Sequence, residues 1–134
     1  FPWAQLTHID IGDCSPNDCL QILEQASTAI ACSFEIRRDS SLQHSPLITH
    51  SQLEVLKIYA YVHLRPLWSR LTCPALISLS IESSRRQGLA GLLQFFTRSG
   101  ETIENVKLID CGLSDNQFMS CLRDLPLLRR LDVS

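Results

Sequence analysis

The sequence predicts an α/β fold made of one repeated unit, in which a short parallel strand is followed by a helix or a loop. Two observations predict it. The pattern apolar-x-x-apolar-x-apolar occurs six times, and apolar residues recur between most of these segments at the i, i+3, i+4, i+7 spacing of a helix face. Strand, helix and parallel strand in succession form right-handed units. We therefore expect a solenoid with a curved parallel β-sheet and with helices on its convex side.

The six strand segments each contain three apolar residues that we expect to face the core. The first residues of successive triplets are separated by 25, 22, 23, 27 and 25 residues, within the period of roughly 20–29 residues of leucine-rich repeats. The second unit is the weakest, because Ala31 stands where the other units have a large residue. The triplets are Leu6/Ile9/Ile11, Ala31/Phe34/Ile36, Leu53/Leu56/Ile58, Leu76/Leu79/Ile81, Ile103/Val106/Leu108 and Leu128/Leu131/Val133.

Four segments between the strands present an apolar stripe two helical turns long. Ser15 is positioned as an N-cap, and Ser114 and Gln117 have the spacing of a capping box. Pro66 can occupy the first turn of a short helix, and Gly100 can end one. The stripes are Cys19/Ile22/Leu23/Ala26, Leu64/Leu67/Trp68/Leu71, Leu89/Leu92/Leu93/Phe96 and Phe118/Cys121/Leu122/Leu125.

Residues 37–52 connect the second and third strand segments without such a stripe. The segment is rich in Ser, His and Asp. We predict a loop here, with at most one short turn around Leu47 and Ile48.

Length and composition fit one leucine-rich-repeat domain over residues 1–134, with about six repeats. The chain begins with Phe1 and ends inside an expected strand, so we expect both ends to be truncated. A net charge of -2 gives no reason to expect nucleic acid as a partner, and no apolar run is long enough for a membrane span. The six cysteines are spread through apolar patterns, so we expect reduced, buried thiols and an intracellular protein, cytoplasmic or nuclear.

Catalytic and metal-binding motifs give no specific signal. Four residues separate Cys14 from Cys19 and no second pair matches this spacing, so we expect no zinc and no other cofactor. A serine-nucleophile elbow, a His-Glu-x-x-His pair and a phosphate-binding glycine loop are all missing from the sequence. His8 and Asp10 share one face of a strand, and we interpret them as solvated side chains and not as an acid/base pair. We therefore expect that this chain is not an enzyme.

Two units have a cysteine three positions after the last triplet residue, namely Cys14 and Cys111. These units resemble the cysteine-type repeats of F-box proteins, and residues 71–79 and 125–132 are similar to the repeat arrays of fungal F-box proteins. The resemblance implies that the repeats hold a protein substrate, while a separate F-box recruits a ubiquitin ligase through an adaptor. Since the chain contains no recognisable F-box, adaptor binding requires one outside it. In three other units the position of this cysteine is occupied by Asp39, Tyr61 and Ser84.

Residues between the core-facing positions are expected to lie on the concave face of the sheet, in three rows across the strands. The candidate partner-binding residues are Lys57, Tyr59, Glu82, Lys107 and Ile109. The rows are Asp10, Glu35, Lys57, Ser80, Lys107, Asp132; then His8, Ser33, Val55, Ser78, Asn105, Arg130; then Gly12, Arg37, Tyr59, Glu82, Ile109, Ser134.

We expect a protein–protein interaction scaffold, which could be the substrate-recognition region of an F-box-type ubiquitin-ligase receptor. A structural repeat fragment without autonomous binding and a hydrolase of unrecognised type remain alternatives.

Overall fold

The structure is a computed structural model that describes residues 2–39, 47–84, 91–112 and 114–134. It confirms the predicted α/β fold with a parallel sheet. Six strands pair in the order β1-β2-β4-β6-β7-β8, and every pair is parallel. Their bounds are β1 His8–Cys14, β2 Ala31–Ile36, β4 Val55–Ala60, β6 Ser78–Ser83, β7 Asn105–Ile109 and β8 Arg130–Val133.

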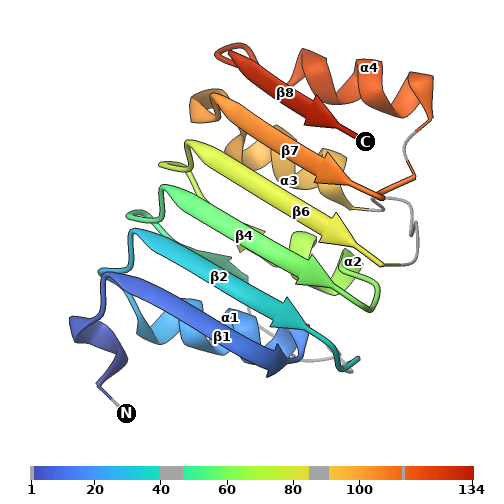
Figure 1. Cartoon of the computed structure of the whole chain (residues 1–134). Helices are drawn as coiled ribbons and strands as arrows, with labels where there is room; N and C mark the ends of the chain where they lie inside the picture. The colour runs from blue at the N-terminus through green and yellow to red at the C-terminus, as the bar shows by residue number, and fades with distance from the viewer. Residues whose placement is uncertain (1, 40–46, 85–90, 113) are drawn as a thin grey trace.

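The four α-helices of the described residues lie on one side of this sheet, and the two termini lie at its opposite edges (Figure 1). The α-helices are α1 Pro16–Gln25, α2 Arg65–Trp68, α3 Leu92–Ser99 and α4 Asp115–Arg123, and the 3-10 helices are η1 Trp3–Gln5 and η2 Gly100–Thr102. On the helix side, β3 (Ile48–Thr49) and β5 (Leu71–Thr72) form a second, two-stranded parallel sheet. The opposite face of the six-stranded sheet bears no helix of the described ranges, and we call it the open face.

The core fills the space between the sheet and the helices. In β4 and β6 every second side chain is buried, as the alternation of a strand requires. The largest buried side chains from the helices include Trp68 and Phe95, whose ring centroids lie 4.8 Å apart. Aromatic side chains of this size contribute much of the apolar surface that folding removes from water.

The helix boundaries follow the predicted signals. Ser15 and Asp18 form a capping box at the start of α1, and Ser114 and Gln117 form one at the start of α4. Pro66 lies in the first turn of α2, as predicted. This helix has four residues, however, and Leu71 lies beyond it in β5. Gly100 follows α3 directly, where η2 begins.

The second repeat lies two residues away from its predicted frame. His8 pairs with Ala31 and Ala31 pairs with Val55, so the residue equivalent to Leu6 and Leu53 is Ala29, which is fully buried. The triplet of this unit is therefore Ala29/Cys32/Phe34, not Ala31/Phe34/Ile36. The sequence pattern was ambiguous because Ile36, at the far end of β2, is buried as well.

Turn hydrogen bonds define the repeat independently of side chains. In the turns before β2, β4, β6, β7 and β8, two successive backbone N–H groups donate to one carbonyl of the preceding unit, for example those of Ile30 and Ala31 to Thr7. The accepting carbonyls belong to Thr7, Ile30, Glu54, Ile77 and Glu104. Their separations of 23, 24, 23 and 27 residues equal those of the corrected triplets. The backbone thus repeats with the same period as the core residues.

The predicted loop is described only in part. Residues 40–46 lie outside the described residues. One short turn was predicted around Leu47 and Ile48, but Ile48 belongs to the short strand β3, which pairs with β5. No helix of the described residues is long and apolar enough to cross a membrane.

Candidate protein-binding surface

The open face presents three rows of side chains at right angles to the strands. The second repeat's shift moves Ala31, Ser33 and Glu35 into the rows where Ser33, Glu35 and Arg37 were predicted. The first row is His8, Ala31, Val55, Ser78, Asn105, Arg130; the second is Asp10, Ser33, Lys57, Ser80, Lys107, Asp132; the third contains Glu35, Tyr59, Glu82 and Ile109.

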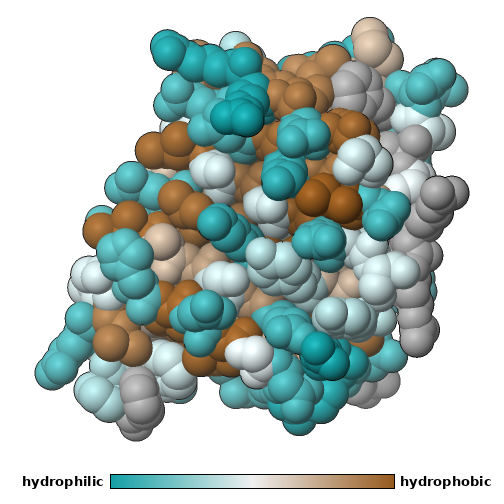
Figure 2. Space-filling view, viewed as in Figure 1, coloured by the Kyte–Doolittle hydropathy of each residue, from teal (hydrophilic) through white to brown (hydrophobic). Residues whose placement is uncertain are grey.

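The five candidate residues lie together on β4, β6 and β7. Tyr59, Glu82 and Ile109 are cross-strand neighbours in one row, and Lys57 and Lys107 flank Ser80 in the next. All five side chains reach the surface, although Ile109 is half-buried. Tyr59 is 44% exposed, which is high for a large aromatic side chain. Hydrophilic and hydrophobic residues are mixed across this face (Figure 2).

Two grooves on the open face meet at Tyr59. The first has a volume of about 460 Å³ and is lined by the polar residues Lys57, Ser80, Lys107 and Arg130. We call it the basic groove, because its three cationic side chains face a single carboxylate, which belongs to Asp132.

The second groove, at the carboxyl ends of β4 and β6, has a volume of about 490 Å³. Its charged lining residues are Glu82 and Asp110, and its aromatic ones are Tyr59 and Tyr61. We call it the acidic groove. Since Tyr59 lines both grooves, it lies where two regions of opposite charge meet.

Arg37 is a surface residue that the sequence placed in the wrong row. Its guanidinium lies 4.7 Å from the centroid of the Tyr61 ring and forms an ion pair with Glu35. With the corrected frame, Arg37 and Tyr61 occupy the position that Cys14 and Cys111 occupy in their units, and Asp39 does not. A stacked cation–π pair therefore stands where two other units have a buried thiol.

Cys14 and Cys111 are structural. Their Sγ atoms lie 3.5 Å from the Glu35 carbonyl oxygen and 3.6 Å from that of Ile81, respectively. Each follows an aspartate with positive φ, 52° at Asp13 and 55° at Asp110, a conformation that Asp tolerates better than most residues. Burial raises the pKa of both thiols to about 11, so neither is a thiolate nucleophile near neutral pH. The repeated Asp-Cys pair was a sequence signal for this turn.

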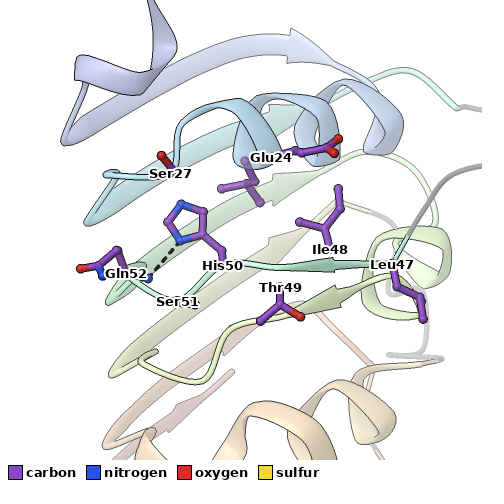
Figure 3. Close-up of a pocket in the computed structure, with 9 residues that line it drawn as sticks. Glu24, Ser27, Leu47, Ile48, Thr49, His50, Ser51 and Gln52 are labelled. Atoms are coloured by element: carbon purple, nitrogen blue, oxygen red, sulfur yellow. Dashed lines mark hydrogen bonds between the residues drawn. The ribbon is translucent and has the colours of Figure 1, made fainter.

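A cavity of about 390 Å³ on the helix side is lined by α1 and the segment around β3 (Figure 3). His50 lines this cavity and is buried. Nδ1 of His50 accepts hydrogen bonds from the N–H groups of Leu53 at 3.0 Å and Gln52 at 3.3 Å, so Nε2 carries the proton and donates to the Ala26 carbonyl at 2.8 Å. Both nitrogens are engaged by backbone, and His50 therefore ties α1 to the turn before β4 instead of offering a base.

The remaining cysteines and acidic groups form no metal site in the described ranges. No group of three or more His, Cys, Asp or Glu side chains in them could hold a metal ion. All six cysteines of the chain are buried and free. His8 is exposed, and its Nδ1 lies 3.0 Å from Thr7 Oγ1.

Comparison with models of known protein families, with curated proteins and with solved structures found no match. The repeat frame and the open face are therefore the features from which a function can be inferred.

Proposed function

We propose that the chain is a leucine-rich-repeat solenoid that acts as a protein-interaction scaffold and binds its partner on the open face. The sequential strand order and the repeated turn bonds support the solenoid, because each unit pairs only with the units before and after it. The helices pack their apolar sides against the core. The open face is then the broad surface that remains for a partner.

The observation that carries this proposal is the position of Tyr59. It is a large aromatic side chain, nearly half exposed, held at the centre of the face on a rigid strand and bordered by grooves on two sides. Binding energy in protein interfaces is concentrated in a few aromatic or arginine residues that are surrounded by polar groups. Tyr59, with Lys57, Glu82, Lys107 and Ile109 around it, has this arrangement.

The resemblance to F-box proteins adds a cellular role to the proposal. In this role the chain is the intracellular substrate-recognition region of a ubiquitin-ligase receptor, and an F-box outside the chain recruits the adaptor. The hydrolase alternative has less support, because the buried histidine His50 has both ring nitrogens bonded to backbone atoms.

The test is a binding titration against the partner captured from the source cell. Tyr59→Ala should weaken binding by about 1–3 kcal/mol if Tyr59 is a hot spot. Its fold should survive, since the side chain points away from the core, and circular dichroism checks this. Gln94→Ala is the matched control, because Gln94 is exposed on α3, on the helix side.

The proposal is wrong if Tyr59→Ala binds like the parent while Gln94→Ala loses affinity. In that case the partner would dock on the helix side.

A further inference from the structure

The charges of the open face are separated along the strand direction. The basic groove covers the middle of β4, β6 and β7, where Lys57 and Lys107 flank Ser80, and Arg130 lies on β8 beyond Asn105. The acidic groove lies at the carboxyl ends of the same strands, with Glu82 and Asp110. A ligand that spans both grooves therefore meets positive charge first and negative charge next.

Within the described residues, these charges form no ion pairs. The ion pairs of the described residues join Arg37 to Glu35, Arg38 to Asp13 and Asp18, and Arg129 to Glu104. None involves Lys57, Lys107, Arg130, Glu82 or Asp110. Arg37, the cation that directly follows the neighbouring strand β2, already pairs with Glu35 and stacks on Tyr61. Both grooves can therefore pair with charges on a ligand.

The spacing of the two grooves along β6 matches the side-chain repeat of an extended polypeptide. Ser80, at the floor of the basic groove, and Glu82, in the acidic groove, are two residues apart on β6, which is roughly 6.5 Å in a strand. In an extended ligand the side chains at positions i and i+2 point to the same side with the same spacing. Two such side chains would stand over the two grooves with Tyr59 beside them.

We propose that the open face recognises an extended segment of a protein partner that carries an acidic and a basic side chain two residues apart. The carboxylate lies between Lys57 and Lys107 and can accept a hydrogen bond from the Ser80 hydroxyl. The cation lies beside Glu82 and Asp110. The ring of Tyr59 packs against the aliphatic parts of both side chains. This inference rests on the proposed function and specifies the chemistry of the partner.

The first test uses short peptides and the whole chain, with backbone amide chemical shifts in NMR as the readout. The probe is an acetylated, amidated Thr-Glu-Thr-Lys-Thr peptide, whose β-branched residues favour extended backbone. It should shift the amide signals of Lys57, Ser80 and Glu82. Peptides with Glu at both positions or Lys at both positions should bind about three- to tenfold more weakly, since one groove would then face like charge. A peptide with adjacent Glu and Lys should also bind more weakly, because its charges point to opposite sides.

The second test reverses the charge of one groove. The double variant Glu82→Lys with Asp110→Asn should prefer the peptide with two Glu residues, and Lys107→Glu should shift preference towards the peptide with two Lys residues. Asn is chosen at position 110 because it tolerates the positive φ found there. Glu101→Lys is the matched control, because Glu101 is exposed on η2, away from the open face, and the variant should keep the parent's preference.

The inference is overturned if the peptides bind equally, if charge reversal does not change the preference, or if no signal shifts at about 5 mM peptide, well above the Kd of a weak complex. These outcomes are distinct from failure of the proposed function. If the captured partner still loses affinity for Tyr59→Ala while the peptides fail, the open face binds protein and only the charge pattern is wrong. If the partner is indifferent to Tyr59→Ala, the proposed function itself fails.

Discussion

The middle of the sheet and its last strand contain the same apolar pattern but bury it to different degrees. Ile58 in β4 and Ile81 in β6 are 1% and 0% exposed, whereas Val133, at the same position in β8, is 46% exposed. Leu131 is half-buried, although its partner Val106 in β7 is buried. The central strands have a paired strand on both sides, and β8 has one on one side only.

This difference shows that burial in this fold depends on the neighbours of a strand more than on its own sequence. A residue in a central strand is covered by its own helix and by the units on both sides. A residue in β8 lacks the layer of a following unit, and its removal from water is incomplete. Stability should therefore be concentrated in the central units.

The largest expected effect comes from truncating equivalent residues in the two regions. Ile81→Ala should lower the free energy of unfolding by about 2–5 kcal/mol, because it leaves a cavity in a fully packed site. Val133→Ala should cost less than about 0.5 kcal/mol, as exposed substitutions do. Urea denaturation measures both. Equal losses in the two variants would refute the comparison.

Replacing His50 tests the connection between α1 and the centre of the sheet. His50→Ala should cost about 1–3 kcal/mol, because the buried N–H of Leu53 and the Ala26 carbonyl lose their partner. His8→Ala on the terminal strand β1 is the control and should leave the thermal midpoint nearly unchanged, since that ring is exposed. A His50→Ala protein as stable as the parent would mean that water replaces the imidazole.

The attachment of the last unit depends on close packing at Gly100. A Cβ at this position would collide with the backbone carbonyl oxygen of Asp124. Gly100→Ala should therefore cost at least about 1 kcal/mol and increase amide hydrogen exchange in α4 and β8 before the rest of the sheet. Gly12→Ala is the matched control, since its new Cβ would come no closer than 3.9 Å to Glu35 Oε2. Faster exchange throughout the sheet would argue against a separable terminal unit.

The last effect concerns the buried thiols and is seen only at alkaline pH. Burial raises the pKa of Cys32 and of Cys73 to about 12, above the ordinary thiol value of 9.0. Above pH 9 the unfolded chain loses thiol protons that the folded chain retains, so stability is unaffected below pH 9 and falls from pH 9 towards 12. The thermal midpoint measured from pH 8 to 11 should show this decline. In Cys73→Ala the decline should be shallower; a slope equal to the parent's would show that other groups cause it.

The core and the helix starts could be predicted from the sequence because they depend on local patterns. Alternating apolar residues identify the buried side of Leu56, Ile58 and Ile81, and the caps at Ser15 and Ser114 depend on residues three positions away. The frame of the second repeat could not be predicted. A slip of two residues keeps every side chain on the same face of the sheet. Phe34 and Ile36 therefore face the core in either frame. Only the bonds between strands distinguish the two frames.

The candidate surface could also be predicted only where the frame of the repeat was clear. Lys57, Tyr59, Glu82, Lys107 and Ile109 were placed in their correct rows, because their units have a clear frame. The residues of β2 were misplaced by one row. The stack of Arg37 on Tyr61 and the pairing of β3 with β5 join segments about 24 residues apart through geometry that no local pattern encodes.

The paired N–H bonds in the turns also determine where the chain can change its length. From β2 to β8 the strands keep a constant register, while the interval between accepting carbonyls ranges from 23 to 27 residues. All of this variation falls in the segments that cross behind the sheet. An insertion there leaves the spacing of side chains on the open face unchanged. The back of the molecule can therefore be remodelled by gain or loss of residues, while the front changes only by substitution.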